Sequence, residues 1–131
     1  MKTKKPVPSF KKNPLPYPVL MIGIKKEKKE LDKLITMRFF DWLKQGFLTE
    51  IIKLKKKGLT WKRIEEFGIH YRQAAQYLQK QINEQEFIDN SLKELKNYAK
   101  RQMTWFKKDK RIKWVKDYKK TEKLIKKFLY K

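Results

Sequence analysis

The sequence predicts a mainly helical protein of the α+β class with two short strands. Apolar residues recur every three or four positions over most of residues 26–130, which is the spacing of one helical face. Gly46, Gly58 and Gly68 divide this pattern into separate helices. Two short segments, 19–24 and 111–115, interrupt the helical spacing with patterns that are typical of strands.

The chain begins with a proline-rich and lysine-rich arm. All five prolines lie in residues 1–18. Because proline lacks a backbone donor and favours extended backbone, we expect an irregular extended arm or a disordered linker there. The apolar run 19–24 follows, and its continuous apolar character favours a strand buried on both faces, as in a parallel sheet. The expected domain organisation is therefore an arm, 1–18, followed by a single unit, 19–131.

The first expected helix spans residues 26–45 and carries a charge on its apolar stripe. Arg38 lies three residues after Ile35 and four before Trp42. A charge on an apolar face is costly unless it meets a partner. Two interpretations are open: Arg38 snorkels or forms an ion pair within the protein, or it binds an anion.

Three shorter helices are expected next, at 47–57, at 61–67 and from residue 69 onward, with Thr60 as the N-cap of the second. His70, the only histidine, is interpreted as an ordinary polar residue at a helix start. With no cysteine and no second histidine, a metal site is not expected. The absence of cysteine also excludes a disulfide scaffold.

The longest helix is expected from about residue 84 to about residue 106, with Asn83 and Glu86 forming a capping box. Its predicted buried stripe consists of Ile88, Leu92, Leu95, Ala99, Met103 and Phe106. Residues 98–107 read Tyr-Ala-Lys-Arg-Gln-Met-Thr-Trp-Phe-Lys. This stretch is either a solvated basic face or a phosphate-binding face, with Arg101 and Gln102 as planar donors and Trp105 as a stacking surface.

Two elements complete the expected fold. Residues 111–115 alternate polar and apolar side chains, which predicts a short strand at a sheet edge. Residues 121–130 predict a final amphipathic helix with a solvated lysine face and Leu124, Ile125, Phe128 and Leu129 inward.

The charge of the chain indicates a polyanionic partner. The formal net charge is +22, and residues 95–131 contain 15 lysines and arginines against 3 acids, a net +12. Nucleic acid is the first candidate partner and an acidic membrane surface the second. The longest apolar run is too short to cross a bilayer, and no signal peptide is expected.

The stretch 98–106 resembles the C-terminal signature of the tRNA dimethylallyltransferases. These enzymes attach a five-carbon prenyl group to the exocyclic amine of the adenosine just 3′ of the anticodon. Residues 3–6 (Thr-Lys-Lys-Pro), 46–51 and 67–73 are similar to further family motifs, with Lys4 and His70 standing where the family commonly has glycine. The resemblance extends over nearly the whole chain and covers less than half of such an enzyme.

The resemblance implies a fold and a set of contacts. The fold would be a C-terminal slice of an α/β core like that of the P-loop NTPases, and Arg38 would face the diphosphate of the prenyl donor. The tRNA contacts that it implies, chiefly to the anticodon stem-loop, are Tyr71, Arg72, Lys100, Arg101, Gln102, Met103, Thr104, Trp105, Phe106 and Lys107.

No catalytic residue is expected on this chain. It has no Gly-x-x-x-x-Gly-Lys-Ser/Thr loop, no catalytic triad and no pair of active-site carboxylates. The family keeps its phosphate loop and catalytic base in the N-terminal half, so Mg²⁺ and dimethylallyl diphosphate are implied for the complete enzyme, and no cofactor is expected on this chain alone. We expect a cytoplasmic fragment that supplies tRNA-binding surface, that is inactive alone, and that has a separate N-terminal half as a candidate partner.

Two other function classes are open. The chain is alternatively a non-catalytic basic RNA-binding module that uses the same surface. A basic amphipathic protein of the membrane surface is the weaker alternative, because lipid binding does not require the glycine-capped helices and family-like motifs found here.

Overall fold

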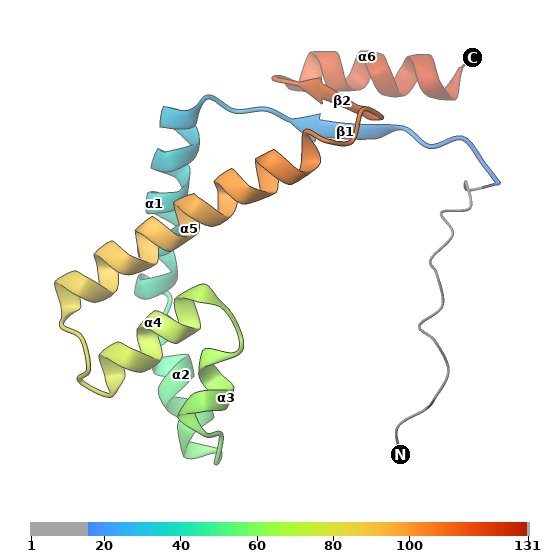
Figure 1. The fold of residues 1–131 in the computed structure, drawn as a ribbon. Coiled ribbons are helices and arrows are strands. Elements are labelled where there is room, and N and C mark those ends of the chain that lie inside the picture. The colour runs from blue at the N-terminus through green and yellow to red at the C-terminus, as the bar shows by residue number, and fades with distance from the viewer. Residues whose placement is uncertain (1–15, 131) are drawn as a thin grey trace.

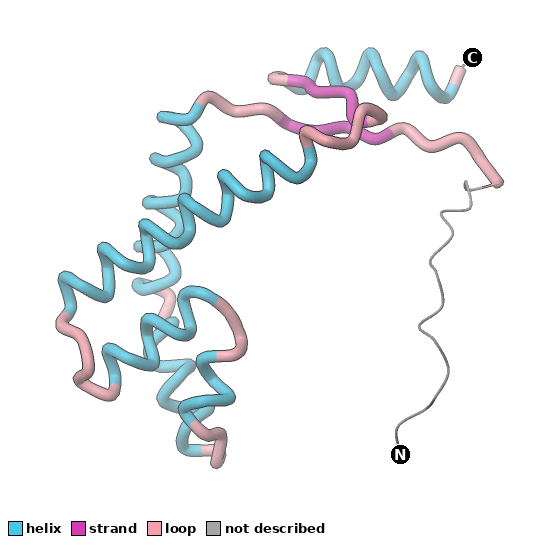
Figure 2. Tube along the Cα trace, viewed as in Figure 1, coloured by secondary structure: helices cyan, strands magenta, loops and turns pink. Residues whose placement is uncertain are grey.

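The computed structural model describes residues 16–130, so nearly all of the predicted arm lies outside the described residues. The described part is mainly helical with two short strands, as predicted (Figures 1 and 2). In chain order the elements are β1 (Met21–Ile24), α1 (Lys28–Lys44), α2 (Phe47–Lys56), α3 (Trp61–Glu65), α4 (Ile69–Leu78), α5 (Glu84–Phe106), β2 (Ile112–Val115) and α6 (Tyr118–Leu129).

The two strands form a parallel pair although almost the whole helical region separates them in sequence. The register runs from Met21 opposite Ile112 to Ile24 opposite Val115. Parallel pairing was the arrangement predicted from the apolar run. Burial of β1 on both faces was wrong: three of its residues are half-buried, and Ile24 is 67% exposed. The reason is that, within residues 16–130, β1 packs mainly against its partner strand β2, so that its faces stay partly open.

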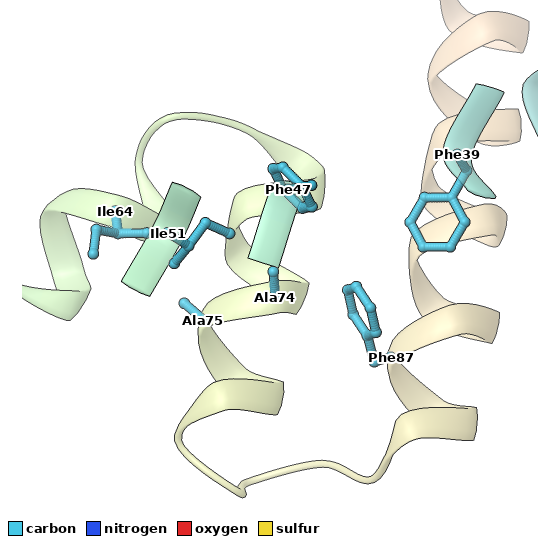
Figure 3. Close-up of a cluster of buried hydrophobic side chains, with 7 residues drawn as sticks. All are labelled: Phe39, Phe47, Ile51, Ile64, Ala74, Ala75 and Phe87. Carbon is cyan, nitrogen blue, oxygen red and sulfur yellow. The ribbon is translucent and has the colours of Figure 1, made fainter. Parts of the chain in front are cut away.

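The helical core lies away from the sheet and is formed by the five helices α1, α2, α3, α4 and α5. Its fully buried side chains come from five helices, and Figure 3 shows their arrangement. The small side chains of Ala74 and Ala75 are completely buried, which allows α4 to pack closely against its neighbours. The cluster consists of Phe39, Phe47, Ile51, Ile64, Ala74, Ala75 and Phe87.

Helix α5 begins with the predicted capping box. The Asn83 Oδ1 accepts from the Glu86 backbone N–H at 2.9 Å, and the Glu86 carboxylate accepts from the Asn83 N–H at 2.8 Å. The most buried residues of α5 lie one position before those that the predicted stripe contains. The fully buried residues are Phe87 and Ser91, whereas the predicted stripe is half-buried and its last member, Phe106, is 41% exposed. Because α5 packs against both α4 and α1, the side chains that lie between these two contacts, Phe87 and Ser91, are the most deeply buried of the helix.

Helix α6 starts three residues earlier than predicted. The Asp117 carboxylate caps it by accepting from the Lys120 backbone N–H at 2.8 Å. Leu124 and Phe128 are half-buried, but the prediction that Ile125 and Leu129 point inward was wrong, since they are 41% and 65% exposed. Within residues 16–130, α6 packs mainly against the single short strand β2, which leaves part of its apolar face uncovered.

Within residues 16–130, no helix combines the length and the apolar character that crossing a membrane requires.

Candidate functional site

The C-terminal half of α5 presents most of its polar side chains to solvent. Trp105 is 69% exposed, and its ring meets the edge of Phe106 with centroids 5.1 Å apart. The Arg101 guanidinium lies over the ring of Tyr98 at 5.9 Å. The Thr104 hydroxyl donates to the Lys100 carbonyl at 3.0 Å, as threonine commonly does within helices.

This part of α5 has two opposite faces. Ala99, Met103 and Phe106 line an apolar groove of about 610 Å³ that borders the sheet. At about 100° per residue, five of the predicted contact residues fall within one arc on the other side of the helix. We call this arc the basic face of α5; it consists of Lys100, Arg101, Thr104, Trp105 and Lys107, all exposed. The structure therefore places Met103 and Phe106, also predicted as tRNA contacts, on the sheet side.

A second hollow lies where α1, α4 and α5 meet, and we call it the Arg38 cavity. It has a volume of about 560 Å³. Arg38, His70 and Gln102 line it, one from each helix, and each carries a polar donor. The Arg38 Cζ lies 4.7 Å from the centroid of the Trp42 ring. The remaining lining residues are largely apolar: Leu31, Ile35, Trp42, Gly68, Ile69, Leu95, Tyr98 and Ala99.

Arg38 is exposed at the mouth of this cavity and stacks on an aromatic ring. Of the carboxylates in residues 16–130, none lies within ion-pair distance of it. The guanidinium therefore keeps its hydrogen-bond donors available to an anion such as a carboxylate or a phosphate. Within residues 16–130 the structure shows no ion pair of Arg38, and its exposed position fits both a snorkelling side chain and an anion ligand.

His70 packs among aromatic rings beside Arg38. Its ring centroid lies 4.9 Å from that of Trp42 and 5.4 Å from that of Phe47. Burial lowers the pKa of His70 below its usual 6.5, the positive charge of Arg38 lowers it further, and the negative charge of Glu50 acts in the opposite direction. The sequence interpretation of His70 as an ordinary helix-start residue missed this environment, because the rings around it come from other helices.

Tyr71 is held in place by its neighbours. Its hydroxyl donates to Glu50 at 3.0 Å, and its ring meets Phe47 and Phe67 edge-on at 5.1 and 5.6 Å. Burial and the interaction with Glu50 raise the pKa of Tyr71 above its usual 10.0. Arg72 is exposed on the next position of α4.

The structure divides the predicted site residues among the Arg38 cavity, a hollow at Tyr71, the two sides of the C-terminal half of α5 and, for Arg72, the exposed surface of α4. Arg38 and Gln102 share the Arg38 cavity with His70. Tyr71 lines a neighbouring hollow of about 330 Å³ together with Glu50 and Gln45. The remaining predicted residues of α5 lie on its basic face or on its sheet side. Among residues 16–130, no three metal-binding side chains gather at one point.

Comparisons with known proteins agree on one family. The family model described as "IPP transferase" matches residues 1–109. The tRNA dimethylallyltransferase of Syntrophomonas wolfei is 36% identical over 112 residues, which cover 84% of this chain and 36% of that protein. The tRNA dimethylallyltransferase of Acetivibrio thermocellus is 31% identical over 134 residues, which cover 98% of this chain and 43% of that protein.

A solved structure gives the same answer. The full-length tRNA isopentenylpyrophosphate transferase from Bacillus halodurans superposes with a TM-score of 0.75 and 28% identity, over 88% of this chain and 39% of that one. This chain spans roughly two fifths of the length of these relatives. Because the family model covers most of the residues, the chain belongs to the IPP transferase family.

Proposed function

We propose that this chain supplies the tRNA-binding surface of a tRNA dimethylallyltransferase. In the proposed reaction a dimethylallyl group passes from dimethylallyl diphosphate to the adenosine 3′ of the anticodon. Family membership and the names of the relatives support this assignment. The chain spans only part of their length, so the proposed activity, in the cytoplasm, also requires the part of such an enzyme that lies outside the matched region.

The basic face of α5 is the observation that carries the proposal. Lys100, Thr104 and Lys107 follow one line along the helix, and all three are exposed. The two lysines of this row suit the phosphates of an RNA strand, while the Thr104 hydroxyl donates to the Lys100 carbonyl. Beside this row the exposed Trp105 offers a ring face to an unpaired base, the usual means by which proteins hold loop nucleotides. An anticodon stem-loop presents both features, a charged stem and a single-stranded loop.

Arg38 has a different proposed role, at the prenyl donor. Its guanidinium is exposed, stacked on Trp42 and near Gln102 in one cavity. Guanidinium and amide donors suit the oxygens of a diphosphate better than they suit Mg²⁺, which prefers carboxylates and water. The target adenosine would have to leave the stack of the anticodon loop to reach this donor.

The test is binding of an anticodon stem-loop to the purified chain over a salt series. We expect Trp105→Ala to weaken binding of the stem-loop more than binding of a duplex of the same length, because only the loop offers unstacked bases. Arg101→Ala should weaken both, and Arg101→Lys should recover part of the loss. The matched controls are Tyr118→Ala and Lys123→Ala on α6, also an exposed aromatic and an exposed cation.

The result that would overturn the proposal is equal weakening by site and control variants, with all polyanions bound alike. The charge of +22 alone would then explain the binding.

A non-catalytic RNA-binding module is the second candidate, because the basic face of α5 could act without a prenyl donor. Mixing the chain with a separately produced N-terminal half of a relative distinguishes the two. Restored prenylation of tRNA favours the split enzyme, and unchanged tRNA binding without activity favours the module.

A further inference from the structure

His70 forms part of the wall between two hollows of opposite character. On one side lies the Arg38 cavity, where Arg38 and Gln102 provide donors. On the other side lies the smaller hollow that contains Glu50 and Tyr71. Trp42 is the other residue that lines both. The imidazole therefore stands between a cation and a carboxylate.

The groups around His70 determine its charge. His70 faces Arg38 of α1 and Glu50 of α2. Its own helix also provides Tyr71, whose hydroxyl already donates to Glu50. From α5 the cavity receives Leu95, Tyr98, Ala99 and Gln102, none of which carries a charge at neutral pH. Burial and the nearby guanidinium both disfavour the imidazolium, and Glu50 offsets them only in part.

We propose that His70 is a second anion-contacting side chain of the Arg38 cavity, and that it takes up a proton when an anion binds beside Arg38. This inference rests on the proposed role of Arg38 as an anion ligand. A bound phosphate or diphosphate group would cancel the positive charge that now opposes protonation, and it would offer the imidazolium an acceptor. Because linkage is reciprocal, such an anion binds more tightly as the pH falls.

The titration of the His70 ring, followed by NMR, tests this inference directly. His70 is the only histidine, so the NMR signal of its ring C–H is unambiguous in the whole protein. Sulfate is a suitable probe because its charge does not change between about pH 5 and about pH 8, the range in which histidine titrates. Sodium chloride at equal ionic strength is the necessary reference, since salt screens the charge of a strongly basic protein.

We expect sulfate to raise the pKa of His70 more than chloride does. Arg38→Gln should abolish this extra rise, whereas Arg72→Gln, which removes an exposed arginine of α4, should leave it in place. In His70→Gln, sulfate should still bind at about pH 8 but should lose the several-fold gain in affinity that the wild type shows at about pH 5.

Two results separate the failure of this inference from the failure of the proposed function. If sulfate perturbs the Trp42 indole signal in an Arg38-dependent way but moves the His70 titration no more than chloride, Arg38 binds anions and the role of His70 is wrong. If sulfate changes neither signal beyond the chloride reference at any pH, both the anion role of Arg38 and that of His70 are wrong.

Discussion

The rings of Phe39 and Phe87 lie with centroids 5.7 Å apart and planes tilted by 57°, at one end of the cluster of buried side chains that Figure 3 shows. Each is 1% exposed. On its other side, Phe87 stacks on Tyr77 of α4 at 5.2 Å with an interplanar angle of 9°. Phe87 therefore joins α1, α4 and α5, the three helices that carry Arg38, His70 and Gln102 into one cavity.

Replacing Phe87 by alanine should lower the free energy of unfolding by about 3–5 kcal/mol, because the cavity left between three helices cannot collapse without moving them. Urea unfolding followed by circular dichroism measures this loss. Phe87→Leu, which keeps more of the volume, should cost less. Tyr130→Ala is the matched control: Tyr130 is 84% exposed, and its removal should change stability by no more than about 0.5 kcal/mol. Equal effects at both positions would contradict the assignment of Phe87 to the core.

The features that the sequence predicts correctly depend on residues close together in the chain. The capping box of Asn83 and Glu86, the Thr60 cap and the glycines after helices depend on groups within a few positions of one another, and the structure confirms them. The mainly helical class follows from the same local periodicity.

The parts that the sequence does not predict depend on contacts between distant segments. Phe87 and Ile88 are adjacent apolar residues, and only the packing of α5 against α4 and α1 decides which one is buried. Likewise, nothing within α4 indicates that His70 meets Trp42 of α1 and Phe47 of α2. The exposure of Ile24 depends on how many strands pair with β1, which its own apolar run cannot specify.

Gly23 lies at a position of the sheet that has no room for a side chain. A Cβ built on it would lie 2.6 Å from the Trp114 Cε3 and 2.8 Å from the Ile112 Cγ2, both on the paired strand. Gly23→Ala should therefore displace the Trp114 indole and destabilise the pairing of β1 and β2 by about 1–3 kcal/mol. Amide hydrogen exchange of residues 112–115 should accelerate. In contrast, Lys56→Ala on the exposed surface of α2 should leave these amides unchanged.

The lowered pKa of His70 predicts how stability depends on pH. A group whose pKa is lower in the folded than in the unfolded protein binds fewer protons when folded, so it contributes stability above its unfolded value of about 6.5 and loses it as the pH falls. We expect the urea midpoint of the wild type to fall more between about pH 7.5 and about pH 5 than that of His70→Gln. Since both proteins keep the same carboxylates, parallel curves would show that His70 does not titrate differently on folding.

The basic face of α5 predicts the salt dependence of RNA binding. Each phosphate neutralised by a lysine contributes about 0.7–0.9 to the slope of log K against log salt, because counterions are released. If Lys100 and Lys107 each contact a phosphate, the double substitution to alanine should reduce this slope for an anticodon stem-loop by about 1.5.

The matched control removes the same charge from another exposed surface. Lys123 and Lys127 lie on α6 and are exposed, and their double substitution to alanine should reduce the slope much less. Filter binding at several salt concentrations provides both slopes. A protein that attracts RNA only through its net charge would respond equally to the two pairs, since each removes two charges from the same total of +22. A difference between the pairs therefore measures contact with phosphates at the basic face of α5, separately from the long-range attraction that any basic protein exerts.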